Sequence, residues 1–130
     1  MISLPLMRLL LDTNILLLHL SENILSSAPK ETEFYISTIT VAEALRYPGL
    51  GDDDIRSLID LMSIMTSVSV DNTIAQRAGE IGRTRSTRLP DLLIAATALE
   101  WNLTLITKNI KDFKNIPSLD FRDSIDALPI

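Results

Sequence analysis

The stretch Leu9-Leu10-Leu11-Asp12-Thr13-Asn14 decides the fold that this sequence predicts. The apolar run over residues 6–11, interrupted only by Arg8, is typical of a strand buried on both faces of a parallel sheet. Three polar residues follow at the point where this strand should end. Because ligands of open α/β sheets bind beyond the carboxyl ends of the strands, Asp12 is the first candidate for a functional residue.

Length and composition indicate one folded domain over residues 1–130, since the chain has 130 residues of which 46% are hydrophobic. The absence of cysteine excludes disulfides, thiolate zinc sites and cysteine nucleophiles. Residues 1–20 contain Arg8, Asp12, Asn14 and His19, so they form neither a membrane span nor a signal peptide. We therefore expect a cytoplasmic protein that does not enter a membrane.

The rest of the chain alternates strands with helices. Further strands are expected over residues 34–37, 67–70, 103–107 and 119–121, and helices over residues 13–21, 40–47, 72–83 and 91–101 and from residue 52 onward. Trp101 is expected in the core. This alternation predicts a three-layer α/β/α sandwich with a short, mostly parallel central sheet.

Three acidic residues occupy equivalent places relative to the carboxyl edge of that sheet. Asp12 follows the first strand, Glu43 lies early in the helix after the second, and Asp91 lies in the first turn of the helix before the fourth. Each has an ordinary alternative: Asp12 as a helix cap, Glu43 in a capping box with Thr40, and Asp91 as a partner of the helix dipole. Gathered in one crevice, they would repel one another unless a cation were bound. Oxygen ligands without cysteine favour Mg²⁺ or Mn²⁺.

A fourth region, residues 107–113, follows the fourth strand. Here Asn109 offers a neutral amide oxygen, Asp112 a full charge, and Phe113 a core anchor. Hydroxyl and amide groups near the strand ends either orient the carboxylates or serve ordinary turn chemistry: Thr13, Asn14, Ser37 and Thr107. A single histidine, His19, and the lack of glycine-rich phosphate loops exclude two-histidine ribonucleases and nucleotide-fuelled enzymes.

Basic residues gather on both sides of the Asp91 segment although the net charge is −5. They are Arg77, Arg83, Arg85, Arg88, Lys108, Lys111 and Lys114. They form either a solvated surface or a rim that guides phosphates, and the sequence leaves both open.

Four segments in register resemble the PIN domain, and most of all the small VapC-type toxins of toxin–antitoxin pairs. They are Leu11-Asp12-Thr13-Asn14-Ile15-Leu16, residues 36–43, residues 91–98 and residues 105–113. The resemblance implies a Mg²⁺- or Mn²⁺-dependent endoribonuclease whose metal ligands are Asp12, Glu43 and Asp91. Asn109 stands where many members carry a fourth Asp, so it joins the candidate catalytic set as a departure from the pattern. The resemblance also implies an RNA substrate, a homodimer and an inhibitory antitoxin.

Two other functions remain open from the sequence. The first, which Asn109 favours, is a catalytically weak PIN-like module that binds RNA or a protein. The acid after the first strand also suits a receiver- or phosphatase-like domain in which Asp12 accepts a phosphoryl group.

Overall fold

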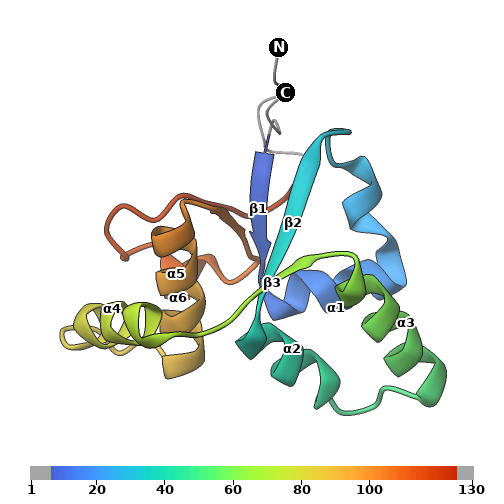
Figure 1. The fold of residues 1–130 in the computed structure, drawn as a ribbon, viewed down its shortest axis with the longest axis horizontal. Coiled ribbons are helices and arrows are strands. Elements are labelled where there is room, and N and C mark those ends of the chain that lie inside the picture. The colour runs from blue at the N-terminus through green and yellow to red at the C-terminus, as the bar shows by residue number, and fades with distance from the viewer. Residues whose placement is uncertain (1–6, 126–130) are drawn as a thin grey trace.

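The computed structural model describes residues 7–125, which form one parallel sheet between two groups of helices (Figure 1). The strands are β1 (Met7–Leu11), β2 (Thr32–Ser37), β3 (Thr66–Val68), β4 (Thr104–Ile106) and β5 (Phe121–Arg122). They lie in the order β3-β2-β1-β4-β5, and each neighbouring pair is parallel. The predicted α/β class is confirmed. Leu6, expected to open the first strand, lies outside the described residues.

Two helical layers cover the sheet. The helices are α1 (Thr13–Glu22), α2 (Thr38–Leu45), α3 (Asp52–Ser63), α4 (Asn72–Gly82), α5 (Leu89–Trp101) and α6 (Ile110–Phe113), with a 3-10 turn η1 (Ile24–Ser27). In Figure 1, α4, α5 and α6 lie on one side of the sheet, whereas α1, α2 and α3 lie on the other. The chain therefore builds one layer mainly from its first half and the other from its second.

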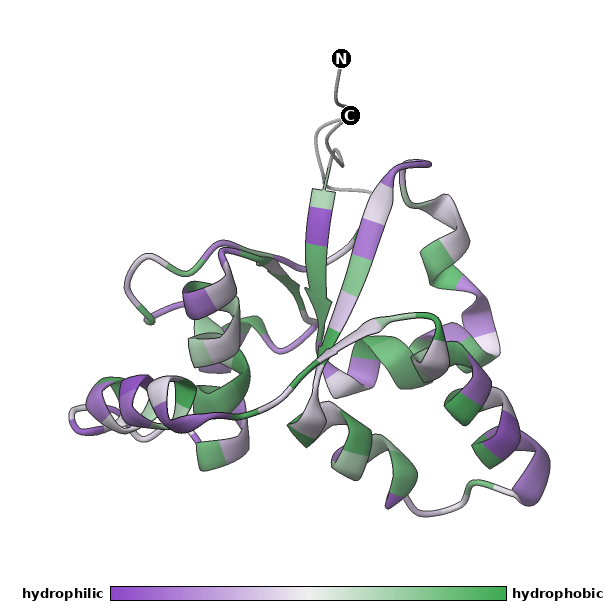
Figure 2. Ribbon diagram, viewed as in Figure 1, coloured by the Kyte–Doolittle hydropathy of each residue, from purple (hydrophilic) through white to green (hydrophobic). Residues whose placement is uncertain are grey.

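The consecutive leucines of β1 bury side chains in two different cores. Leu10 packs with the core under α4 and α5, whereas Leu9 and Leu11 pack with the core under α1, α2 and α3. All three are at most 1% exposed, as a central strand covered on both faces requires. Figure 2 shows hydrophobic colour over most of β1 and α5.

Helix α5 approaches the sheet and α4 closely because its inner side is small. Ala95, Ala96 and Ala98 are all buried. At the end of α4, a Cβ atom on Gly82 would lie 2.7 Å from Cδ1 of Leu92, so a larger residue there would force the Leu92 side chain to shift.

Two differences from the sequence expectations concern the ends of α5 and the segment after β4. Trp101, expected in the core, is 42% exposed, and its ring lies at the surface 6.4 Å from the ring of Tyr35. The short helix α6 was not expected; it places Phe113 in the core with no exposed surface.

Strand order reverses between β1 and β4, since β2 and β3 extend the sheet from one side of β1 and β4 and β5 from the other. At this junction the backbone N–H of Asp12 donates to the carbonyl of Ile106, with a distance of 3.0 Å. In open α/β sheets such a reversal leaves a crevice beyond the strand ends. Asp12 and Thr107 lie at its two sides.

Candidate active site

Asp12 is a buried carboxylate that is held at both oxygens. It is the N-cap of α1, where Oδ1 accepts a hydrogen bond from the backbone N–H of Thr13 at 2.8 Å. Oδ2 accepts from the hydroxyl of Thr107 at 2.7 Å. Burial raises the pKa of Asp12, the two hydrogen bonds oppose this, and the charge of Glu43 raises it further. Asp12 can therefore cap α1 and also take part in a functional site, because its two carboxylate oxygens accept hydrogen bonds from different residues.

Glu43 does not form the capping box expected from the sequence. Helix α2 begins at Thr38, and Ser37 caps it by accepting from the N–H of Ile39 at 3.0 Å. Glu43 is therefore the sixth residue of the helix, one turn later than expected, and its Oε1 accepts from the hydroxyl of Thr13 at 2.7 Å. The capping-box alternative for Glu43 is wrong, because Ser37 already caps this helix.

Thr13 joins the first two acids. Its backbone N–H donates to Asp12 and its hydroxyl donates to Glu43, while the hydroxyl oxygen of Thr40 lies 3.4 Å away. Both threonines are buried. Hydrogen bonds of this kind fix the rotamers of two carboxylates that would otherwise repel one another.

Asp91 lies in the first turn of α5, directly after Pro90. Its pKa is raised to about 6, first by burial and then by the charges of Asp12, Asp112 and Glu43, with Arg88 opposing. Burial is the main cause, and the smaller effects of the other acids mean that Asp91 lies close enough to feel their charges.

Asn109 and Asp112 are paired with each other. The side-chain Nδ2 of Asn109 donates to Oδ2 of Asp112 at 2.6 Å. The backbone N–H of Asn109 donates to the Thr107 hydroxyl at 3.0 Å, and this same hydroxyl donates to Asp12. Thr107 therefore links the loop after β4 to the acid after β1.

One hollow of about 300 Å³, called the acidic cleft below, is lined by Asp12, Glu43, Asp91 and Asn109 among others. Its lining comprises Asp12, Thr13, Asn14, Glu43, Arg46, Tyr47, Pro48, Arg88, Asp91 and Asn109. All four candidate residues of the sequence analysis lie in it. Arg46 and Tyr47 were missed; Arg46 is the C-cap of α2 and Tyr47 follows it, so both lie close after Glu43 in the chain.

The chemistry of the acidic cleft fits a hard divalent cation. It offers carboxylate and amide oxygens, and the coupling that raises the pKa of Asp91 is a cost that a cation would remove. Within residues 7–125, however, no three His, Cys, Asp or Glu side chains are arranged as a ready set of metal ligands. Mg²⁺ commonly binds through only one or two carboxylates and keeps several waters, so two direct ligands suffice.

The basic residues divide among different places. Arg88 lines the acidic cleft, whereas Arg85, Lys111 and Lys114 line a separate hollow. Arg77 forms a salt bridge with Glu100 at 2.9 Å. The basic residues that are clustered in the sequence therefore do not form one continuous rim around the acidic cleft.

Fold and site together define a small α/β/α domain with an acidic cleft where the order of a parallel sheet reverses. Residues 9–119 match the model of the PIN domain, and the chain belongs to the PIN-domain family. This membership takes the place of the receiver- or phosphatase-like alternative.

Individual relatives point the same way. A segment of 30 residues is 60% identical to Ribonuclease VapC from Rickettsia bellii, and it spans 23% of this chain and only 22% of that relative. The crystal structure of VapBC2 from Rickettsia felis bound to a promoter DNA fragment is similar, with a TM-score of 0.73, 27% identity, and coverage of 89% of this chain and 98% of that one.

A toxin–antitoxin complex from Klebsiella pneumoniae is similar with a TM-score of 0.65 and 28% identity, over 85% of this chain and 93% of that one. No helix within residues 7–125 has the length and hydrophobicity needed to cross a membrane.

Proposed function

We propose that this protein is a Mg²⁺- or Mn²⁺-dependent endoribonuclease and the toxin of a VapBC-type toxin–antitoxin pair. The observation that carries the proposal is the acidic cleft itself, in which Asp12, Glu43, Asp91 and Asn109 come together from four segments of the chain. Membership of the PIN-domain family and the likeness to VapBC structures support it.

Asp12 and Asp91 are the proposed direct ligands of the cation, and Glu43 binds it directly or through water. When bound, a divalent cation lowers the pKa of an attacking water and offsets charge on the phosphate. Thr107 and the backbone of Thr13 keep the Asp12 carboxylate ionised and oriented, since both donate to it. Arg88 lines the same cleft and supplies a positive charge to an approaching phosphate.

The order of events follows from these charges. The acidic residues repel RNA as long as no cation is present, so RNA should bind well only to the metal-loaded protein. Because the pKa of Asp91 is about 6 in the absence of metal, the cation should bind more tightly as the pH rises through that region and Asp91 gives up its proton.

The decisive experiment compares wild-type protein with Asp12→Asn on single-stranded RNA, with Mg²⁺, with Mn²⁺ and with a chelator. We expect metal-dependent cleavage by the wild type and none by the variant, while circular dichroism shows an intact fold. A matched control is Asp123→Asn, which removes one charge from an exposed aspartate that does not line the acidic cleft. Cleavage by Asp12→Asn at the wild-type rate would refute the assignment.

The proposed partners are a second copy of the chain and an antitoxin. The Klebsiella relative is a toxin–antitoxin complex, and this chain exposes several large hydrophobic side chains that a partner would cover: Leu45, Tyr47, Ile59, Ile64, Leu89 and Trp101. Light scattering on the purified chain tests the homodimer. Co-expression with the protein encoded beside it tests the antitoxin, whose binding should suppress RNA cleavage.

A second candidate function is an RNA-binding module that cleaves weakly or not at all. It is favoured by Asn109, a neutral residue in the acidic cleft whose amide is hydrogen-bonded to Asp112. RNA binding by wild-type protein without cleavage in either Mg²⁺ or Mn²⁺ would select this function.

A further inference from the structure

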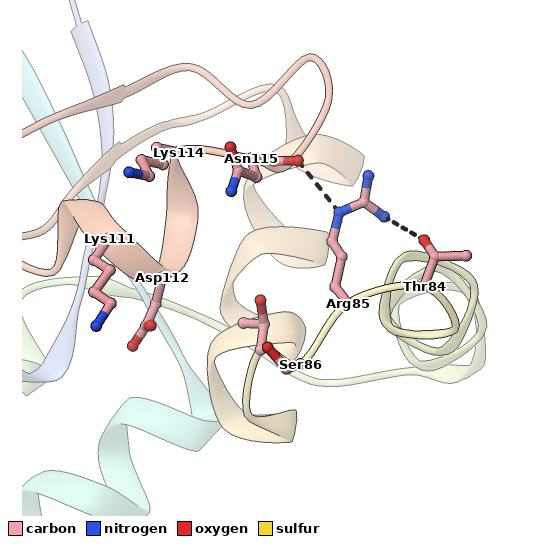
Figure 3. A pocket seen from close by; sticks show the side chains of 8 residues that line it. Thr84, Arg85, Ser86, Lys111, Asp112, Lys114 and Asn115 are labelled. Carbon is pink, nitrogen blue, oxygen red and sulfur yellow. Dashed lines mark hydrogen bonds between the residues drawn. The ribbon is translucent and has the colours of Figure 1, made fainter.

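A second hollow, called the basic pocket below, lies beside the acidic cleft and has a volume of about 580 Å³. Its lining is Thr84, Arg85, Ser86, Thr87, Lys111, Asp112, Lys114 and Asn115. Figure 3 shows the α6 side chains and Asn115 on one side of it, and Thr84, Arg85 and Ser86 on the other. None of the residues that line it has a role in the proposed reaction.

Arg85 builds the pocket by joining its two walls. Its Nη1 donates to the carbonyl of Ile81 at 2.8 Å, and its Nε donates to the carbonyl of Asn115 at 3.2 Å. The loop after α4 is thereby held against the turn after α6. The guanidinium is a fixed positive charge at this position, since carbonyl groups orient it without neutralising it.

The pocket carries positive charge in a protein whose net charge is −5. Three cationic side chains face one carboxylate, Asp112. Lys111 and Lys114 are exposed, and within residues 7–125 neither forms a salt bridge. Hydroxyl groups of Ser86 and Thr87 add neutral donors. This combination of flexible ammonium groups and hydroxyls is suited to phosphate.

The basic pocket and the acidic cleft share a wall. Asp112 lines the pocket and is hydrogen-bonded to Asn109, which lines the cleft. On the facing loop, Thr87 lines the pocket and the next residue, Arg88, lines the cleft. A polymer with one phosphate in the cleft therefore has another phosphate within reach of the pocket, which a mononucleotide does not.

We propose that the basic pocket binds the backbone phosphate of an RNA nucleotide that flanks the cleavage position. The inference rests on the proposed ribonuclease function and assigns a place to the rest of the substrate. No aromatic side chain lines the pocket, so it holds the strand in register without stacking on a base. The contact is therefore independent of the base at that position.

The test measures RNA binding apart from cleavage. All proteins carry Asp12→Asn, which stops cleavage and also removes one of the charges that repel RNA when no cation is bound. The probe is a fluorescent, unstructured single-stranded RNA whose anisotropy is followed in Mg²⁺ at several salt concentrations. One protein also carries Lys111→Gln and Lys114→Gln. The control carries Lys30→Gln and Arg56→Gln, which remove the same charge from exposed residues outside the pocket.

We expect the pocket variant to bind roughly tenfold more weakly than the control at ~0.1 M salt. Its slope of log affinity against log salt should be shallower by about 1.4, because each ion pair with a single strand contributes about 0.7. Equal affinities and slopes for the two variants would overturn the inference. The same result is expected if the pocket binds an acidic peptide and not RNA.

A different result would refute the proposed function: wild-type protein that does not cleave RNA. If cleavage is absent and the pocket variant still loses affinity, the pocket binds RNA in a non-cleaving module. If wild-type protein cleaves and the two variants bind alike, only the pocket assignment is lost.

Discussion

Replacing Asp91 by Asn should make the protein more stable and inactive at the same time. Asp91 is half-buried beside Asp12, Asp112 and Glu43, and these surroundings raise its pKa to about 6 from 3.8. The folded state therefore holds the proton of Asp91 more tightly than the unfolded chain does. Asparagine is nearly isosteric and carries no charge, so it removes the cost of burying a carboxylate and the repulsion by the other acids. It also removes the proposed cation ligand.

The size of the effect follows from the shift. A change of about two pKa units in a fully buried group corresponds to about 3 kcal/mol. Because Asp91 is only half-buried, solvent screening reduces this, and we expect Asp91→Asn to gain about 1–2 kcal/mol at neutral pH without metal. For a domain of this length the melting temperature should rise by roughly 3–8 °C.

The pH dependence identifies the cause. Wild-type stability should fall, relative to the variant, as the pH rises from about 4 to about 6, since the unfolded chain ionises Asp91 first. Calorimetry in chelator at pH values on both sides of this window measures the difference, with Asp123→Asn as the matched control. A variant no more stable than wild type at pH 7, or a gain that does not change with pH, would refute the electrostatic reasoning.

Two further substitutions separate positioning from ligation. Thr107→Val removes the donor to Asp12 Oδ2, so turnover should fall ten- to a hundredfold, and the pH at which activity rises should move upward. Thr107→Ser keeps the hydroxyl and should restore most of the turnover and of the pH profile. A serine variant as impaired as the valine variant would contradict this. Glu43→Gln keeps an oxygen that accepts from Thr13, so the melting temperature should not drop, whereas metal-dependent turnover should fall at least tenfold. Unchanged turnover in a steady-state assay would mean that Glu43 has only a structural role.

The sequence predicts the sheet and the candidate residues because both depend on local patterns. A run of leucines ending in Asp12 specifies a buried strand and its carboxyl end, and Asp91 follows a proline that begins a helix. Parallel topology then brings the acids into the acidic cleft. The α/β class and the family resemblance are confirmed, whereas the catalytic and ligand roles remain proposals.

The features that the sequence did not predict depend on competition between neighbours or on distant contacts. The start of α2 was misplaced because Ser37 and Thr40 are both good caps, and only the structure shows that the earlier one is used. Trp101 was expected to be buried on account of its type, yet it sits at the last position of α5, where little packs over it. The basic pocket depends on Arg85 reaching Asn115, thirty residues away.

The pairing of β1 with β4 has a consequence for protein synthesis. Asp12 is among the first described residues to leave the ribosome, but the Ile106 carbonyl and the Thr107 hydroxyl that complete its surroundings are made almost a hundred residues later. Asp91 and Asn109 also belong to the second half of the chain. The acidic cleft therefore cannot assemble on a nascent chain until the segment around Ile106 and Thr107 has left the ribosome.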